Sequence, residues 1–397
     1  MKKYLERNIR LFYVLRALTL PYFWLPILYF YLINIKGFSV AQTTILLGLQ
    51  ELMLVFLEVP TGVVADKISR KFSVGLGIAI TSLPLAMLPF VDSYLGALVI
   101  FSTRAIGKAL VSGADSSLLY DTLKDLDRVN EYKKIKTQSA ALVMGVATIC
   151  MFVGGWMGQL GLYAWAIILP FPIQLFAALM VMTMVEPESS RAAKKIQESN
   201  YLRHVVSAVK IVARSRSIMF LAIAFAVLEG TAVNMKWYYP AIFEMLRFDL
   251  WFSGIIMSML YGVKTIINWL GSRLILNDAM SNTKIWTSVI AAAWIVFSLI
   301  NAVWIIIPLL IVVLLGLEIA TNSSEELIHE RLDSTVRATA MSFVNLLSSV
   351  AATILLWSWG GAIQYTNTQI SIGLQGLFFA IVVGLLFLAR GRAISEK

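Results

Sequence analysis

The chain has 397 residues, of which 59% are hydrophobic and only 14% are charged. Soluble domains are roughly a quarter charged, so this composition excludes a soluble globular protein, and its apolar content excludes a disordered chain. The 33 Lys and Arg residues exceed the 23 Asp and Glu residues and give a net charge of +10. In so apolar a chain this excess indicates loops that face anionic lipid, and it predicts no nucleic-acid partner.

Twelve apolar stretches are each long enough to cross a bilayer as a helix, which takes about 20 residues. Turn and charge signals separate them, as at Glu186, Pro187 and Glu188. The sequence therefore predicts an all-α membrane protein whose transmembrane helices form two six-helix, pseudo-symmetric halves. The twelve predicted spans are residues 11–33, 41–64, 73–91, 94–117, 138–160, 163–185, 217–240, 250–273, 284–301, 303–321, 337–358 and 369–389.

The positive charges fall almost entirely on one side of these spans. Of the 33 Lys and Arg residues, five lie within spans, two (Lys36 and Arg247) lie in loops on one side, and the other 26 lie on the opposite side with both termini. Cytoplasmic loops carry such an excess. The sequence thus predicts a multi-pass protein of the plasma (inner) membrane with both termini in the cytoplasm.

The longest polar stretch lies in the middle of the chain and divides it. It predicts an N-terminal bundle over 1–187, a cytoplasmic linker over 188–216 and a C-terminal bundle over 217–397. Apolar residues at helical spacing from Leu202 to Val212 predict an amphipathic helix, lying on the membrane surface or solvated as a linker. A short repeat that matches 118–123 with 327–332 supports two related halves.

A short loop between the second and third spans combines a glycine, an acid and a basic cluster. At this position in a 6+6 protein it resembles the G-x-L-A-D-x-x-G-R-K motif of the major facilitator superfamily. Val64 replaces the Leu and Ser69 replaces the second Gly, whereas the matching residues are Gly62, Ala65, Asp66, Arg70 and Lys71.

Two further features resemble the bacterial drug-efflux, proton-antiporter type of this superfamily. The sequence Glu58-Val59-Pro60-Thr61 leads into the loop as in a subgroup of efflux members. The spacing of Gly145, Gly154 and Gly158 resembles the antiporter motif, although Gln159 stands where that motif has Pro. Such glycines also simply let helices pack closely.

The resemblance implies two helical bundles that alternate access to a central cavity. It implies a cytoplasmic gate made of Gly62, Asp66, Arg70 and Lys71, with Asp121 at the end of the fourth span as a partner. In the second half, Glu330 and Arg337 occupy the corresponding place.

Ten ionisable residues lie within the spans or at their inner ends, and each would cost about 2.5–3.5 kcal/mol at a helix centre. They must pair or line a wet cavity, and similar depth suggests the pairs Glu51 with Arg104 and Glu58 with Arg16. The ten are Arg16, Glu51, Glu58, Arg104, Lys108, Asp115, Glu229, Lys236, Lys264 and Glu318.

From this set the sequence predicts proton-coupling residues and substrate-binding residues. A carboxylate in an apolar wall can exchange protons, which favours Glu51, Glu58 and Arg104 for coupling. Trp24, next to kinks expected at Pro21 and Pro26, offers either a cavity wall or helix packing. The group Trp237 to Tyr239 is typical of an aromatic belt at the membrane surface. The predicted substrate-binding residues are Glu51, Glu58, Trp24, Arg16, Glu229 and Lys264.

These features together favour a secondary active transporter that exports amphipathic small molecules or drugs in exchange for protons. A proton-coupled importer of a small polar metabolite or sugar stays open, because topology does not set direction. No ATP-binding G-x-x-x-x-G-K-[ST] motif and no clustered nucleophile occur, so the sequence predicts no enzyme. With one cysteine, Cys150, and histidines only at 204 and 329, it predicts no metal and no cofactor; it predicts a monomer in the lipid bilayer.

Overall fold

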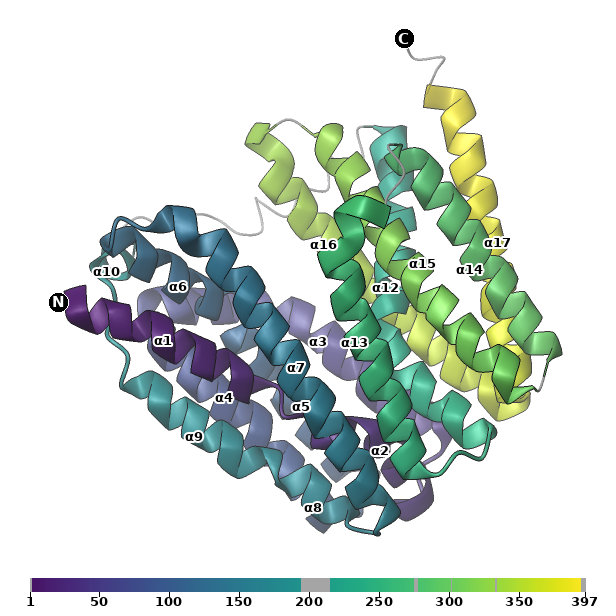
Figure 1. The fold of residues 1–397 in the computed structure, drawn as a ribbon, viewed down its shortest axis with the longest axis horizontal. Helices are drawn as coiled ribbons and strands as arrows, with labels where there is room; N and C mark the ends of the chain where they lie inside the picture. The colour runs from purple at the N-terminus through teal and green to yellow at the C-terminus, as the bar shows by residue number, and fades with distance from the viewer. Residues whose placement is uncertain (1, 194–214, 275–277, 301, 333, 394–397) are drawn as a thin grey trace. The chain divides into compact units, whose positions relative to one another are not determined.

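The computed structural model describes residues 2–193, 215–274, 278–300, 302–332 and 334–393, and their only regular secondary structure is helical (Figure 1). Ten described segments are long and apolar enough to cross a membrane. Two shorter apolar segments, Leu250–Gly262 and Thr368–Val382, add the eighth and twelfth spans. The predicted all-helical fold class with twelve spans is therefore confirmed. The expected amphipathic helix around 202–212 lies outside the described residues.

The first half of the chain contains six spans, several of them built from two helical pieces. Their bounds are α1 Lys2–Thr19, η1 Tyr22–Trp24, α2 Leu25–Phe30, η2 Tyr31–Ile35, α3 Val40–Lys67, α4 Arg70–Met87, η3 Leu88–Phe90, α5 Tyr94–Val111, α6 Ala114–Asp125, η4 Val129–Glu131, α7 Tyr132–Gln159, α8 Tyr163–Ile168, α9 Pro170–Met182 and α10 Glu188–Ala193.

The helices of the second half are longer and less interrupted. Their bounds are α12 Arg216–Met245, α13 Leu250–Leu274, α14 Ala279–Leu299, α15 Val303–Glu330, α16 Ser334–Tyr365 and α17 Thr368–Ala393. Polar caps fix where several of them begin: the side chain of Ser215 accepts from the N–H of Ile218, and Asp278 accepts from two N–H groups at the start of α14. Such caps satisfy backbone donors that a helix start leaves unpaired.

The first span is broken where the sequence places proline. Helix α1 ends at Thr19, Pro21 precedes the short 3-10 turn η1, and Pro26 sits in the first turn of α2. Proline lacks the N–H that a helix interior needs, so the kink expected at Pro21 follows directly from the sequence. The break places Trp24 on the short turn.

The fourth span is broken as well, which the sequence analysis did not expect. It predicted one helix over 94–117, but α5 ends at Val111 and α6 starts at Ala114. The cause is Gly113, whose φ of +75° a helix cannot accommodate. The break redirects the chain so that Asp115 and Asp121 both lie on α6.

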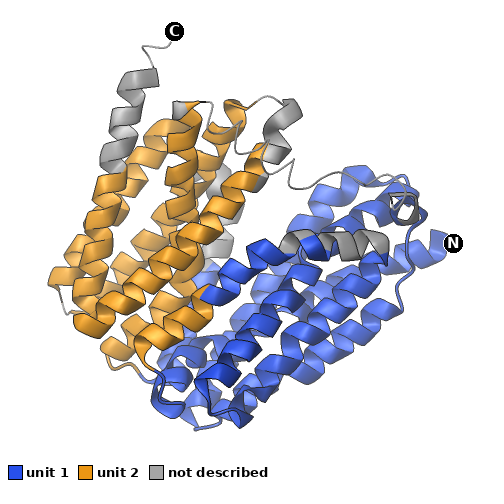
Figure 2. Ribbon diagram, turned by 180° about the vertical axis from the view of Figure 1, so that it is seen from behind, with its two compact units in different colours: residues 1–38, 49–199, 249–262 blue, residues 39–48, 200–248, 263–397 orange. Residues whose placement is uncertain are grey.

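Contacts divide the chain into two compact units (Figure 2). Unit 1 comprises residues 1–38, 49–199 and 249–262, and unit 2 comprises 39–48, 200–248 and 263–397. The start of α3 thus groups with the second half, and the start of α13 groups with the first. Two glycines allow the latter contact, since a Cβ on Gly155 of α7 would lie 2.7 Å from the Cα of Gly254 of α13. The third of the antiporter-like glycines, Gly158, likewise packs against Ile27 and Leu250.

A hydrophobic cluster joins four helices of unit 1 beneath its polar end. It combines Leu15 of α1, Val74 and Ile78 of α4, Leu118 of α6 and Ala177 of α9, all almost fully buried. Burial of such side chains is the main favourable term in holding these helices together. The cluster gives α6 a fixed position against α1 and α4.

The aromatic group at the end of α12 is part of the interior and does not form a surface belt. Trp237, Tyr238 and Tyr239 are each buried to 98% or more. The Tyr238 ring lies 4.3 Å from that of Trp359, and its hydroxyl accepts a hydrogen bond from Gln375. The expectation of an aromatic belt was therefore wrong here, because α12 packs against α16 and α17 along its length.

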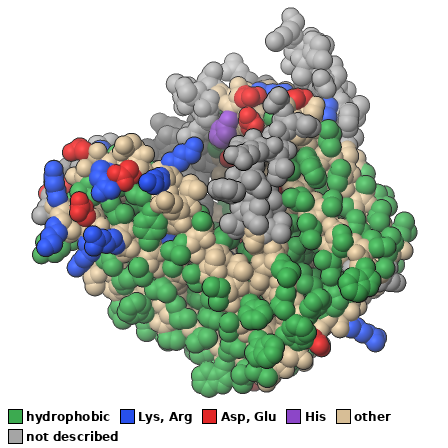
Figure 3. Space-filling view, viewed as in Figure 1, with side chains coloured by type: hydrophobic (Ala, Val, Ile, Leu, Met, Phe, Trp, Pro, Cys, Tyr) green, Lys and Arg blue, Asp and Glu red, His purple; other side chains and the backbone are tan. Residues whose placement is uncertain are grey.

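The surface is rich in exposed apolar side chains. Figure 3 shows hydrophobic side chains over much of one face, whereas charged side chains gather mostly at the end where α1 begins. Large exposed hydrophobic residues include Phe56, Leu95, Ile149 and Trp304. Soluble proteins avoid such continuous apolar surface, so the surface fits a multi-pass protein in lipid.

Candidate functional site

Glutamate and lysine side chains form an ion pair inside unit 1. Glu51 Oε1 on α3 lies 3.7 Å from Lys108 Nζ on α5, and the Glu51 side chain is only 11% exposed. The sequence analysis paired Glu51 with Arg104, which lies one helical turn before Lys108 on the same face of α5. Glu51 thus interacts electrostatically with Arg104, as expected, and also forms an ion pair with Lys108 one turn further along α5.

Arg104 lies on the ring of Trp24. Its guanidinium carbon is 4.8 Å from the ring centroid, and the residue is only 3% exposed. Arginine is attracted to the face of a tryptophan ring, most strongly where water is excluded. Trp24 is itself buried, so its described role is to hold Arg104.

Arg16 of α1 pairs with Asp115 at the first turn of α6. Nη1 of the arginine donates to Oδ2 of the aspartate over 2.8 Å. The sequence analysis expected Glu58 as the partner of Arg16; the side chain of Glu58 lies outside the described residues. The break at Gly113 explains the difference, because it starts a new helix whose first turn faces α1.

A polar network holds the charged end of unit 1. Arg70 forms an ion pair with Asp121, and the Asp121 carboxylate also accepts the hydroxyl of Ser190 at 2.5 Å. Glu186 accepts the backbone N–H of Arg70 at 2.8 Å and so caps α4. Lys71 donates to the carbonyl oxygen of Met184 at 2.9 Å. The network ties the start of α4 to α6 and to the segment after α9.

The other predicted gate residues are less constrained or not described. Glu330 is exposed at the last position of α15. The gate residues Gly62, Asp66 and Arg337 lie outside the part of the chain whose side chains the structure describes, as do the predicted substrate-binding residues Glu58 and Lys264.

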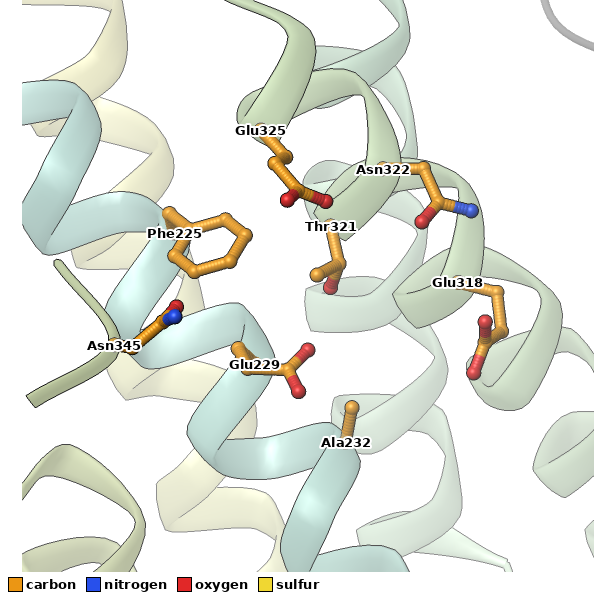
Figure 4. A pocket seen from close by; sticks show the side chains of 8 residues that line it. All are labelled: Phe225, Glu229, Ala232, Glu318, Thr321, Asn322, Glu325 and Asn345. Carbon is orange, nitrogen blue, oxygen red and sulfur yellow. The ribbon is translucent and has the colours of Figure 1, made fainter. Parts of the chain in front are cut away.

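Unit 2 contains a cavity of about 360 Å³ that is lined by carboxylates. Glu229 of α12 lines it together with Glu318 and Glu325 of α15, and no lysine or arginine is among the described lining residues. The remaining lining residues are Phe225, Ala232, Thr321, Asn322 and Asn345. In Figure 4 the carboxylates of Glu229 and Glu325 point toward the space between α12 and α15, and Thr321 lies between them.

The sequence analysis found Glu229 for this cavity but not the residues opposite it. It noted Glu318 only as a buried charge and did not consider Glu325, Thr321 or Asn322. The pattern was present in the sequence, because residues 318, 321, 322 and 325 lie three or four positions apart on one face of a helix. A polar stripe in so apolar a helix predicts a wet or functional face.

One of the lining residues, Glu325, is close to a histidine side chain. His329 Nε2 lies 3.6 Å from Glu325 Oε1, one turn further along α15. Asn322 and Asn345 are exposed, so the cavity is reached from solvent. Among the described residues, no group of three or more His, Cys, Asp or Glu side chains is placed to hold a metal ion. The site therefore offers negative charge and hydrogen-bond acceptors.

Solved structures of transporters have the same fold over almost the whole chain. A variant of nucleoside transporter NupG superposes with a TM-score of 0.79 at 16% identity, covering 96% of this chain and 99% of that one. A bacterial homolog of the human lysosomal transporter Spinster gives 0.74 at 14% identity, covering 98% and 97%. A POT family transporter in complex with 5-aminolevulinic acid gives 0.72 at 12% identity, covering 96% of each chain.

No protein-family model matches the sequence, and no curated protein matches it. At such low identity the structural likeness establishes the fold alone. That fold is the twelve-helix major facilitator architecture that the loop between the second and third spans predicted.

Proposed function

We propose that this chain is a secondary active transporter that works by alternating access and exchanges amphipathic small molecules for protons, with export as its direction. The observation that carries the proposal is the cavity in unit 2, which Glu229, Glu318 and Glu325 line on helices apolar enough to cross a membrane. Charges at such positions are costly and are kept where they bind ions or substrates.

The proposed coupling uses competition between a proton and a positively charged substrate for the same carboxylates. When the cavity faces the cytoplasm the carboxylates are ionised and bind the substrate. When it faces the outside, protons neutralise them and the substrate leaves. Each ligand shifts the equilibrium between the two conformations only by its difference in affinity for them.

The first half contributes coupling and gating residues in this proposal. Glu51, Glu58 and Arg104 keep their predicted coupling roles, because the pair of Glu51 with Lys108 can open when the glutamate takes up a proton. The ion pair of Arg70 with Asp121 stabilises the charged end of unit 1 in one state and is the proposed latch.

The fold supports transport, since the solved structures that share it are called transporters of nucleosides or belong to the POT family. The antiporter-like glycines and the Glu58 to Thr61 sequence favour export. The plasma membrane, with both termini in the cytoplasm, is the proposed location, because the cations lie so unequally on the two sides.

Import of a small polar metabolite is the second candidate. Asn322, Thr321 and Asn345 make the cavity more polar than a site for lipophilic drugs requires. One similar transporter was solved in complex with 5-aminolevulinic acid, a small polar molecule.

Transport by purified protein in liposomes under an imposed pH gradient tests the proposal. The panel contains lipophilic cations, antibiotics and sugars, and each is assayed in both directions. We expect export of a cationic compound that stops when the gradient is collapsed. Glu318→Gln should abolish the pH dependence, whereas Glu326→Gln, an exposed glutamate on the same helix, should keep it. Gradient-independent movement of every compound would contradict the proposal, and uptake of a sugar alone would favour import.

A further inference from the structure

The hydroxyl of Thr321 lacks the hydrogen bond that such a side chain normally makes in a membrane helix. Thr321 is 92% buried, lines the acidic cavity, and its Oγ1 has no hydrogen-bond partner among the described residues. A buried hydroxyl without a partner costs about 1–3 kcal/mol. Because the side chain lines a cavity, a water molecule or a ligand in that cavity can supply the missing bond.

Other hydroxyl groups nearby donate a hydrogen bond to a backbone carbonyl of their own helix, which the Thr321 hydroxyl does not. Ser324 on the same helix donates to the carbonyl oxygen of Ala320 at 2.5 Å, and Thr231 on α12 donates to that of Val227 at 2.9 Å. Serine and threonine in helices commonly satisfy themselves in this way. The hydroxyl of Thr321 is instead turned to the side where Glu229 and Glu325 direct their carboxylates (Figure 4).

From this combination we infer that the cavity is a binding site for a small protonated primary amine, whose ammonium group lies between Thr321 and the carboxylates of Glu229, Glu318 and Glu325. The inference rests on the proposed function and names its substrate class. An –NH₃⁺ group combines a positive charge, which suits a cavity lined by carboxylates, with three N–H donors. Thr321 and the amide oxygens of Asn322 and Asn345 can accept such donors.

The same residues argue against a quaternary ammonium ligand. A trimethylammonium group has the charge but donates no hydrogen bond, so it would leave the Thr321 hydroxyl unsatisfied and would hold the carboxylates further from the nitrogen. Phe225 is the single aromatic side chain among the described lining residues, whereas quaternary ammonium recognition uses a cage of several aromatic rings. Phe225 can instead cover the apolar part of the amine.

The size of the cavity also limits the ligand. Its volume of about 360 Å³ is near the lower end of the roughly 300–1,000 Å³ of small-molecule sites. A compact amine fits within this volume, with its ammonium group at the acidic wall formed by α12 and α15.

A matched pair of probes tests the inference without any transport. Benzylamine and benzyltrimethylammonium share the aromatic body and the charge, and differ in whether the nitrogen donates hydrogen bonds. Binding of each to the purified full-length protein is measured by calorimetry at neutral pH. We expect benzylamine to bind about tenfold or more tightly than the trimethyl analogue, since a hydrogen bond to a charged group is worth that much.

Two variants test whether the preference for benzylamine over its trimethyl analogue arises in this cavity. Thr321→Val keeps the volume and removes the hydroxyl, and it should reduce the preference to about threefold or less. Thr231→Val removes a hydroxyl that its own helix satisfies, and it should leave the preference unchanged. Equal binding of both probes by the unchanged protein, tighter binding of the trimethyl compound, or no saturable binding of benzylamine would each overturn the inference. If the inference fails but the same preparation transports another compound when a proton gradient is imposed, the proposed function still holds. If benzylamine binds as expected but no compound is transported by a proton gradient, the proposed function is contradicted and the inference is not.

Discussion

The interiors of the two units use charged residues in different ways. In unit 1 several acidic side chains form ion pairs with basic ones, as in Glu51 with Lys108, Arg16 with Asp115 and Arg70 with Asp121. In unit 2 three carboxylates share one cavity whose described lining has no cation. Carboxylates therefore join helices through ion pairs in unit 1, and in unit 2 three of them line a cavity that we propose as the cation site. We therefore expect removal of a carboxylate to affect mainly stability in unit 1 and mainly transport in unit 2.

The largest expected change in stability comes from removing an acidic side chain at the end of the fourth span, compared with the same change at the end of the tenth. Asp121→Ala removes the carboxylate that pairs with Arg70 and accepts the hydroxyl of Ser190 in a largely buried position. We expect it to lower the free energy of unfolding by about 3–5 kcal/mol, as for other buried ion pairs that lose one partner. The measurement is thermal unfolding of the purified protein in detergent.

Glu330→Ala is the control at the corresponding position of the second half. Glu330 is exposed, so its removal should change stability by less than about 0.5 kcal/mol. If both variants unfold at the same temperature as the unchanged protein, the network at the end of unit 1 does not carry the stability assigned to it.

The second prediction contrasts glutamine at Glu51 and at Glu229. Glu51→Gln leaves Lys108 without its carboxylate and should lower the unfolding temperature. Glu229→Gln keeps the shape and hydrogen-bonding capacity of the side chain, so it should change that temperature less than Glu51→Gln does, while reducing pH-driven transport by about tenfold or more. Unfolding and proteoliposome transport are measured on the same preparations.

If Glu229→Gln lowers the unfolding temperature more than Glu51→Gln does, the proposed difference between the two units is contradicted. The carboxylates of unit 2 would then stabilise the fold, as those of unit 1 do. Glu326→Gln again serves as the control for loss of a glutamate from α15 outside the cavity.

The third prediction concerns the aromatic support of Arg104. Trp24→Leu removes the ring that lies 4.8 Å from the guanidinium and should cost about 2 kcal/mol of stability, the upper range for a desolvated cation–π contact. Trp24→Phe keeps a ring and should cost less. Equal unfolding temperatures for the two variants would show that Trp24 only fills space.

The smallest expected effect tests the break in the fourth span. Gly113 has a φ of +75° and no atom within 4 Å of the position of a Cβ, so Gly113→Ala should cost about 1 kcal/mol through backbone strain alone. Gly145, also with free space but inside α7, is the control, and Gly145→Ala should gain about 0.5–1 kcal/mol. Stabilisation by both changes would mean that the break between α5 and α6 needs no glycine.

The sequence predicted the spans well because each depends on a long run of apolar residues, a local property. The pairing of charges depends on which face of a helix a residue occupies, and depth alone does not give that face. For this reason Lys108 was missed as a partner of Glu51, although the expected electrostatic interaction of Glu51 with Arg104 is present. The partner of Arg16 was missed because one glycine ends α5 and starts α6. The polar stripe of α15 was readable from its spacing, whereas the closeness of Glu229 to that stripe needed the packing of α12 against α15.

The repeat between the halves shows how such differences arise. The match of Leu118 with Leu327 aligns Gly113 with Asn322. Where the first half has a glycine and breaks its helix, the second half has an asparagine in an unbroken α15, and that asparagine lines the cavity. The aligned position therefore shapes the backbone in unit 1 and lines the cavity in unit 2.

Proton release on substrate binding tests the central claim most directly. Purified protein in unbuffered detergent solution is mixed with the cationic compound found by the transport panel, and the pH is followed. The account predicts release of protons by the unchanged protein and loss of that release when Glu229, Glu318 and Glu325 are all changed to Gln. Undiminished proton release by the triple variant would contradict the claim that the carboxylates of unit 2 exchange protons for the substrate.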